Sequence, residues 1–563
     1  MLIAAVDIGT SSTRALLFDD ARFTDQSAAV EYALKSPEPG AAELDALEVM
    51  SAAVKCIHDL TQAASAPIEC VTLSAAMHSL LAVDARGLPL TAVFTWADNR
   101  AAPIQAKAAE WLHGTTLAPS GADAKTLAPS GAPDNTLAPS GAPATISARS
   151  LYLETGVPFH PMSPLLKLAW LRQTRPAVFR AAHKFVSIKE FVCHQLFGCW
   201  IVDESIASAS GLYHLAQRDW SAAALAAAGV TREQLSAIAA PETVLRGLAA
   251  GYVTALNLAA DTPFVLGASD GCLANLGAGL LSAGGQRRAV LTIGTSGALR
   301  MAAPRPATDA AMRTFCYALS PASNEYVIGG ATNGGGLPLR WLRDNFPQLR
   351  IGVHGGATPG LPTALQHELS GEPAGDAYRT LAALAGQVPA GANGLLFHPY
   401  LAGERAPLWN ADARASFIGL TFNHGPAHLV RAVMEGVLFN LAMILDVLEE
   451  LAGGPVDEII AGGGFARSDF WLQMAADLFG RPLLVASNPE STAQGAALLA
   501  LKAMGRVTSL TAAVAQLPSG SRRIVPNDAA HARYRILREV FNAIPATLAP
   551  FHSRLAAFQR ENV

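Results

Sequence analysis

The chain has 563 residues, of which 51% are hydrophobic and 15% are charged, and its formal net charge is −4. This composition excludes a disordered or fibrous protein, and the length predicts two large domains, because single cores rarely grow beyond about 250–300 residues. No block of like charge is longer than a few residues, so we expect neither a nucleic-acid partner nor a membrane-surface partner.

Cysteine usage and the N-terminal segment predict a cytoplasmic protein. The cysteines show no CxxC spacing and no clustering with histidine, so we expect free thiols in a reducing compartment rather than metal ligands. The start, MLIAAVDIG, has no basic segment and meets an acidic residue at Asp7, unlike a signal peptide. No apolar run approaches the roughly 20 residues of a membrane-spanning helix. The six cysteines are Cys56, Cys70, Cys193, Cys199, Cys272 and Cys316.

The first predicted element is a β-hairpin over residues 2–6 and 14–19, with a turn of glycine, serine and threonine between its strands. Such a turn presents backbone N–H groups with no side chain in the way, and this geometry binds phosphate oxygens. Asp7, at the end of the first strand, is the candidate ligand for Mg²⁺, and the alternative is a solvated strand-end acid. The expected phosphate contacts are Gly9, Thr10, Ser11 and Ser12.

Two further strands lead to the candidate catalytic residue. Residues 71–76 are predicted to form a strand that ends at Met77, and residues 264–269 form one that ends at Asp270. Phosphoryl transfer to a hydroxyl needs an aligned acceptor for the hydroxyl proton, and Asp270 is our candidate base. The alternative is that Asp270 caps a helix, because Asp-Gly-Cys-Leu can open one.

Between these strands lies a segment that differs from the rest. The sequence TLAPSGA begins at Thr116, Thr126 and Thr136, a period of ten residues. It cannot bury enough apolar area to offset the chain entropy lost on ordering. We therefore expect a disordered surface insertion over about residues 114–147.

The hairpin pattern recurs about 285 residues later, with strands over residues 289–293 and 298–301 around a Gly-Thr-Ser turn, which suggests one copy in each domain. A glycine cluster then follows a predicted strand at residues 458–460 and precedes a helix. Glycine lets a flat nucleotide base approach the backbone closely, so we expect the adenosine there. The expected nucleotide contacts in this half are Gly294, Thr295, Ser296, Gly462, Gly463 and Gly464.

The expected domains are residues 1–260 and 261–515, followed by a helical tail over residues 516–563. Within the tail, residues 530–544 are amphipathic at helical spacing, and Pro545 is expected to interrupt the helix. No GxxxxGK[ST] sequence occurs in the chain, which excludes a P-loop kinase.

Together these residues resemble the FGGY family of carbohydrate kinases, within the actin, Hsp70 and hexokinase superfamily. The segments MSPLLKLAWLRQ, from Met162, and ASFIGL, from Ala415, also fit family patterns, although Thr174 departs from them. The resemblance covers nearly the whole chain except the insertion and about the last forty residues. It implies an α/β fold of two ribonuclease-H-like domains around a deep cleft, with ATP mainly on the second domain and the sugar mainly on the first. It also implies Mg²⁺ near Asp7 and catalysis by Asp270.

Four segments look like the gluconate kinase branch of this family: Met77-His78-Ser79, TWADNR, SIKE and GERAPLW. This similarity implies ATP-dependent phosphorylation of D-gluconate to 6-phospho-D-gluconate. The alternatives are a kinase for xylulose, ribulose or erythritol, and a non-catalytic or conformational actin- or Hsp70-like ATPase. ATP and a sugar acid are the expected small-molecule partners, and a second copy of the chain is the candidate protein partner.

Gluconate is a linear polyol with a carboxylate, so its site needs hydroxyl partners and a cation. His78, Asp98 and the neighbouring Asn99 are candidates for the hydroxyls, and Trp96 is a candidate apolar wall unless it belongs to the core. The expected substrate contacts are Met77, His78, Trp96, Asp98, Arg100, Lys189 and Asp270.

Two cations are candidates for the substrate carboxylate. Arg100 or Lys189 would pair with it, and a guanidinium suits a carboxylate best because it can bind both oxygens. The alternatives are that Arg100 neutralises Asp98 and that Lys189 is a solvated surface charge.

Overall fold

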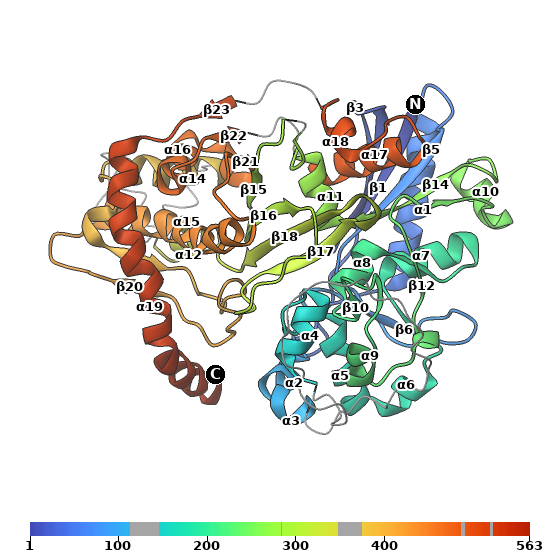
Figure 1. Cartoon of the computed structure of the whole chain (residues 1–563), viewed down its shortest axis with the longest axis horizontal. Coiled ribbons are helices and arrows are strands. Elements are labelled where there is room, and N and C mark those ends of the chain that lie inside the picture. Colours follow the sequence, from blue (N-terminus) through green and yellow to red (C-terminus); the bar gives the residue numbers. More distant parts are fainter. Residues whose placement is uncertain (113–145, 283, 347–373, 486–489, 518–521, 563) are drawn as a thin grey trace, which may run out of the picture. The chain divides into compact units, whose positions relative to one another are not determined.

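The computed structural model describes residues 1–112, 146–282, 284–346, 374–485, 490–517 and 522–562 (Figure 1). Residues 114–145 of the predicted insertion lie outside the described residues. The chain divides into two compact units. The N-terminal unit consists of Val6–Leu16 and Gln26–Asp270, and the C-terminal unit consists of Met1–Ala5, Leu17–Asp25 and Gly271–Val563. The predicted domains, with a boundary near residues 255–265, remain a prediction.

A six-stranded sheet in the order β13–β14–β5–β1–β2–β3 organises the first half of the chain. Strand β14 runs parallel to β5 and antiparallel to β13. Both β14 and β5 are buried along their whole length, which is why their sequences are almost continuously apolar. The strands of this sheet are β1 (Leu2–Ile8), β2 (Ser12–Asp19), β3 (Arg22–Glu31), β5 (Cys70–Ala75), β13 (Val244–Leu245) and β14 (Phe264–Ser269).

A bulge interrupts the pairing of β14 with β5. The register shifts between Val265 and Ala268, and Gly267 within this shift has φ +75°. A Cβ atom at Gly267 would lie 1.7 Å from the carbonyl oxygen of Leu73, so only glycine fits there. The bulge therefore lies just before the end of β14, three residues before Asp270.

Short strands and helices complete the N-terminal unit. Its short strands are β4 (Glu43–Leu44), β6 (Leu81–Val83), β7 (Val93–Phe94), β8 (Lys184–Val186), β9 (Ile201–Asp203), β10 (Tyr213–His214), β11 (Asp219–Trp220) and β12 (Ala237–Ala239). Its helices are α1 (Ala46–Ala63), α2 (Ala102–Ala106), α3 (Ala108–Leu112), α4 (Ala148–Thr155), α5 (Pro164–Thr174), α6 (Pro176–Ala181), α7 (Ile188–Phe197), α8 (Glu204–Ala209), α9 (Ala222–Ala228) and α10 (Ala250–Leu256).

The C-terminal unit is built on a seven-stranded sheet in the order β17–β18–β16–β15–β21–β22–β23. Strand β15 pairs antiparallel with β16 and parallel with β21. A separate antiparallel pair joins β19 (Leu396–His398) to β20 (Ser416–Ile418). The strands of the large sheet are β15 (Arg288–Ile293), β16 (Gly297–Ala303), β17 (Phe315–Ser320), β18 (Glu325–Thr332), β21 (Glu458–Gly462), β22 (Leu483–Val485) and β23 (Arg522–Ile524).

The helices of this unit include one of 26 residues and one of 34. They are α11 (Asp270–Gly277), α12 (Leu337–Asn345), α14 (Ala374–Ala385), α15 (Pro426–Leu451), α16 (Asp469–Phe479), α17 (Ser491–Ala503), α18 (Leu510–Val514) and α19 (Asp528–Glu561). Both predicted hairpins and the α/β fold class are confirmed. Among the described residues, no helix has the length and apolar character needed to cross a bilayer. All six cysteines are free thiols, and five of them are buried.

The expected break at Pro545 is wrong. Helix α19 continues through Pro545 and Pro550 to Glu561, and it lies alongside α15 and α16 (Figure 1). A proline removes one backbone hydrogen bond, but burial on one face of the helix stabilises it on both sides of that position. The residues buried along this face are Tyr534, Phe541, Pro545, His552 and Ala556.

Helices α11 and α17 meet through two glycines. A Cβ atom at Gly277 would lie 1.9 Å from the carbonyl oxygen of Ser491, and one at Gly495 would lie 1.9 Å from that of Leu273. In both cases the obstacle is backbone, which cannot rotate away as a side chain would. The two helices can pack this closely only because neither glycine carries a side chain.

Gly495→Ala should therefore destabilise the protein by about 1–3 kcal/mol or more, the usual cost of overpacking. Gly251→Ala in α10 is the matched control, because nothing lies within 4 Å of the Cβ position there. That change should leave stability unchanged or raise it by about 0.4–1 kcal/mol. The measurement is the thermal unfolding midpoint of both variants, and equal midpoints would contradict the close packing.

Candidate active site

Asp7 and the turn after β1 form one side of the candidate site. The carboxylate of Asp7 accepts a hydrogen bond from Ser74 Oγ at 3.0 Å, and its side chain is only 12% exposed. Arg14 lies 3.9 Å from the same carboxylate. Asp7 is therefore a half-buried, oriented group rather than a solvated strand-end acid. Among the described residues, no three histidine, cysteine, aspartate or glutamate side chains gather as a metal cluster.

The turn from Gly9 to Ser12 is tightly closed. The amide of Gly9 donates to the carbonyl of Ser12 at 2.9 Å, and the hydroxyl of Tyr32 donates to the carbonyl of Gly9 at 2.8 Å. Thr10 accepts a hydrogen bond from the indole N–H of Trp96 at 3.0 Å. Trp96 is 40% exposed, so it is not a core residue, and the structure brings it into contact with the predicted phosphate-binding turn.

Asp270 lies at the end of β14, beside the end of β5. Its Oδ1 accepts a hydrogen bond from the backbone N–H of Met77 at 3.3 Å. The parallel pairing of β14 with β5 brings these residues together, because both strands end at the same edge of the sheet. Asp270 is also the first residue of α11, so it occupies a helix start and a strand end at once. Met77 contributes to this arrangement through its backbone.

His78 follows Met77 in a left-handed backbone conformation, with φ +65°, which few residues other than glycine adopt, although asparagine, aspartate and histidine adopt it more often than the rest. Its ring Nδ1 lies 2.7 Å from the carbonyl oxygen of Ala209. A carbonyl only accepts, so Nδ1 carries the proton, and in the neutral ring Nε2 is an acceptor. That tautomer suits the predicted role of accepting a hydrogen bond from a substrate hydroxyl.

Arg100 is buried among acidic groups. Its guanidinium pairs with Asp98 and Glu38 at 2.6 Å each and with Glu43 at 2.5 Å, and its side chain is 5% exposed. Burial alone would lower the pKa of Arg100, but hydrogen bonds to Asp98 and Glu38 raise that pKa above its ordinary value. The ring of Trp170 lies 4.7 Å from the same guanidinium.

This geometry shows what two of the predicted substrate contacts bind within the protein, and their contact with a substrate remains a prediction. Arg100 neutralises Asp98, which was the alternative considered for it, and would have to leave three carboxylates to bind a substrate. Asp98 is 2% exposed and also accepts from the backbone N–H of Ala42, so its carboxylate is engaged by groups of the protein itself. Sequence cannot give this result, because Glu38 and Glu43 are distant from Arg100 along the chain.

Lys189 also forms its hydrogen bonds with groups of the protein itself. Its Nζ donates to Asp203 at 2.8 Å and to the carbonyl of Ala268 at 3.3 Å, and it is 2% exposed. It is therefore not a solvated surface charge, and its pairing with a substrate carboxylate remains a prediction. Asp203 is fully buried and also accepts from the first turn of α8, which fixes the carboxylate in place.

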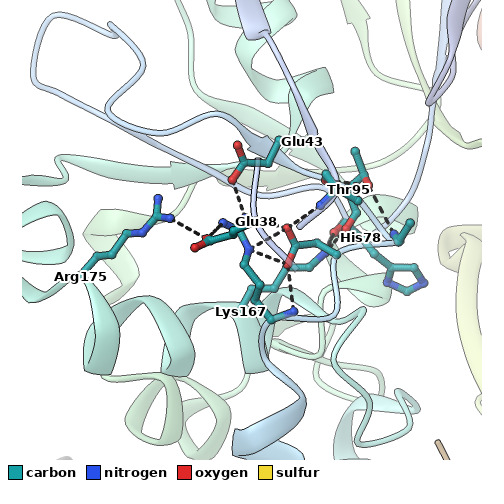
Figure 2. Close-up of polar contacts among 10 residues, drawn as sticks. Glu38, Glu43, His78, Thr95, Lys167 and Arg175 are labelled. Atoms are coloured by element: carbon teal, nitrogen blue, oxygen red, sulfur yellow. Dashed lines mark hydrogen bonds and ion pairs between the residues drawn. The ribbon is translucent and has the colours of Figure 1, made fainter. Parts of the chain in front are cut away.

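Lys167 is a residue that the sequence analysis missed. It is 1% exposed, and its Nζ donates to the carbonyl oxygens of His78 and Thr95 at 2.7 Å each (Figure 2). Burial lowers its pKa to about 7. The available signal was a lone lysine within the apolar run PLLKLAWL, a helix face that is buried throughout.

In the C-terminal unit, the turn between β15 and β16 presents Gly294 and Thr295 to solvent. The loop that contains Gly335 and Gly336 packs against this turn. The amide of Gly336 donates to the carbonyl of Gly294 at 2.6 Å, and a Cβ atom at Gly335 would lie 2.3 Å from Ser296. This supporting loop, at the start of α12, is a further feature that the sequence analysis missed.

The third glycine cluster lies beside this turn. Strand β21 runs parallel to β15, with Gly462 opposite Thr292, so both strands end at the same edge. Gly463 has φ +88°, and a Cβ atom there would lie 2.6 Å from the carbonyl oxygen of Ile293. The structure thus brings together the two predicted nucleotide-binding segments, Gly294–Ser296 and Gly462–Gly464.

Comparison with known families agrees with this arrangement. The N-terminal domain model of the FGGY family of carbohydrate kinases matches residues 2–120 and 143–277, and the C-terminal domain model matches residues 289–504. The chain belongs to the FGGY family of carbohydrate kinases. The N-terminal match contains Asp7 and Asp270, and the C-terminal match contains both glycine segments of the second unit.

Individual FGGY kinases resemble this chain over most or nearly all of its length. The gluconokinase of Bacillus subtilis is 36% identical over 556 residues, which cover 99% of this chain and 98% of that protein. The xylulose kinase of Escherichia coli is 31% identical over 390 residues, which cover 68% of this chain and 72% of that protein. The crystal structure of gluconate kinase from Lactobacillus acidophilus matches with a TM-score of 0.83 and 30% identity, covering 98% of this chain and 99% of that one.

The buried ion pairs of Arg100 predict that this residue stabilises the folded FGGY kinase. Arg100→Ala should destabilise the protein by about 3–5 kcal/mol, because it leaves the carboxylates of Asp98 and Glu43 buried without a cation. Arg175→Ala is the control, since its pair with Glu38 is 39% exposed on the arginine side and should contribute at most about 1 kcal/mol. Urea unfolding of both variants measures this difference. Unchanged stability of Arg100→Ala, with a raised KM for the acceptor, would contradict the structural role.

Proposed function

We propose that this FGGY kinase transfers the γ-phosphoryl group of ATP to D-gluconate, giving 6-phospho-D-gluconate and ADP. The observation that carries the proposal is the 36% identity with Bacillus gluconokinases over 99% of the chain. Over a similar span, the xylulose kinase of Staphylococcus epidermidis is 24% identical. A location in the cytoplasm and a second copy of the chain as partner remain predictions.

Asp270 is the proposed general base. It would accept the proton of the attacking hydroxyl as that oxygen bonds to the γ-phosphorus. The hydrogen bond from Met77 to Oδ1 restricts the rotation of the carboxylate, so the orientation of the base is set before substrate binds. The Nε2 of His78 would accept from another substrate hydroxyl, and Trp96 would provide an apolar wall.

The nucleotide side of the proposal uses the glycine segments of both hairpins. Backbone N–H groups in the Gly9–Ser12 turn and the Gly294–Ser296 turn would bind phosphate oxygens, and Gly462–Gly464 would contact the adenosine. Asp7 fits Mg²⁺, because Ser74 orients its carboxylate and Mg²⁺ in such sites takes one or two carboxylates with waters and phosphates. Bound Mg²⁺ would reduce the charge of the phosphate groups.

The partner of the acceptor carboxylate remains open. Arg100 and Lys189 are both engaged in buried pairs, so the gluconate proposal rests on the relatives and not on those two cations. A kinase for a neutral ketose is the second candidate, because the xylulose kinase structure from Lactobacillus acidophilus also matches with a TM-score of 0.83 and 30% identity.

ADP release with Mg²⁺ and ATP, measured against a panel of acceptors, tests the proposal. The panel contains D-gluconate, other aldonates, xylulose, ribulose, glycerol, erythritol and a blank without acceptor. We expect the highest kcat/KM for D-gluconate. A higher kcat/KM for a neutral sugar would identify that sugar as the acceptor in place of gluconate. ADP release at the same rate with and without an acceptor would indicate a conformational ATPase.

Asp270→Asn should lower kcat by about 100-fold or more, since general-base catalysis contributes factors of about 10²–10⁴. The affinity for ATP, measured by calorimetry, should change little, because the amide keeps the shape of the side chain. Asp261→Asn, at an exposed position in the same unit, is the control and should keep the wild-type rate. Wild-type turnover by Asp270→Asn would remove Asp270 from the mechanism.

A further inference from the structure

Lys167 joins two turns of the N-terminal unit that are distant in sequence. Figure 2 shows its amine between the backbone of His78, after β5, and that of Thr95, after β7. Both contacts are 2.7 Å long, and both acceptors are backbone carbonyl oxygens. The lysine comes from a third element, α5, so a single side chain connects three parts of the fold.

Each of these turns carries a predicted active-site contact next to the carbonyl that Lys167 binds. On one side, Met77 precedes His78 and donates its N–H to Asp270. On the other side, Trp96 follows Thr95 and donates its indole N–H to Thr10. Lys167 therefore binds the carbonyl of His78, the residue after Met77, whose N–H orients the proposed base. It also binds the carbonyl of Thr95, the residue before Trp96, whose indole contacts the phosphate-binding turn.

The chemistry of a buried amine suits this position. An amine has at least two N–H donors even when it is neutral, and two carbonyl acceptors match those donors. Burial lowers the pKa of Lys167, the charge of Asp98 raises it and that of Arg100 lowers it. A methionine of similar length would fill the same space but donate to neither carbonyl. The left-handed backbone of His78 makes that turn dependent on such support.

We propose that Lys167 is a positioning residue for phosphoryl transfer, which holds the turn at Met77 and His78 and the turn at Thr95 and Trp96 in their working geometry. The inference rests on the kinase activity and on Asp270 as the base. A displacement of about 1 Å at a catalytic group can lower the rate about 100-fold, so loss of the two hydrogen bonds of Lys167 should lower kcat.

Lys184 provides a matched control within the same unit. Its Nζ also donates to two backbone carbonyls, those of Glu233 at 2.7 Å and Leu235 at 2.8 Å, and burial lowers its pKa as well. Neither acceptor adjoins a predicted active-site residue. Lysine-to-methionine changes at the two positions therefore remove the same kind of contact, and only one of them adjoins the site.

The experiment compares Lys167→Met with Lys184→Met in the full-length protein, with the acceptor that the panel identifies for the wild type. The thermal midpoint, kcat, and the KM values for acceptor and ATP are measured well below both midpoints. We expect both variants to lose thermal stability, but only Lys167→Met to lose about 100-fold in kcat, with the KM for ATP within about threefold of wild type. Equal kcat values in the two variants would overturn the proposal and leave the kinase activity intact.

If Lys167→Met does not fold, Lys167→Arg replaces it. Arginine keeps donors for both carbonyls, so folding should be retained, but its larger planar head should displace the two turns and lower kcat by at least tenfold. A wild-type kcat in a Lys167→Arg variant whose thermal midpoint is lowered, which would show that the turns are displaced, would overturn the proposal. A wild type inactive on every acceptor would instead refute the proposed function.

Discussion

Parallel strand pairing is the constraint on which the candidate site residues of each unit depend. In the first sheet, β14 pairs with β5, so Asp270 and Met77 emerge at the same edge and a backbone amide meets the carboxylate. In the second sheet, β15 pairs with β21, so two glycine segments emerge side by side. Parallel strands can be joined only by long crossover connections, which is why residues nearly 200 positions apart form one small site. The hairpins β1–β2 and β15–β16 then add a turn at each edge.

Much of this arrangement could be predicted because it depends on local patterns. Apolar runs that end in glycine-rich turns predicted the strands before Gly9, Gly294 and Gly462 correctly, and the strand before Asp270 as well. The long helix at the end of the chain was predicted only in part. Its sequence contains Pro545, a local signal for a break, whereas burial of one face along the helix keeps it continuous.

The roles of the buried charges could not be predicted, because they depend on contacts between distant segments. Arg100 and Lys189 have the charge that a carboxylate substrate requires, but each meets acidic groups of the protein itself, Glu38 and Glu43 in one case and Asp203 in the other. Lys167 was not predicted as a site residue. Its apolar sequence neighbours indicate that it is buried, but they do not indicate its two carbonyl partners. A sequence gives the charge of a residue, whereas the fold decides what that charge is balanced against.

The cluster around Arg100 has a consequence for the evolution of acceptor specificity. One guanidinium pairs with three carboxylates from two segments of the chain, and it also packs against the ring of Trp170. Loss of Arg100 would leave the carboxylates of Asp98 and Glu43, which are 2% and 12% exposed, without this cation. New specificities would therefore arise more readily by substitutions around Trp96, which is 40% exposed, while the charged cluster around Arg100 changes only through several coordinated replacements.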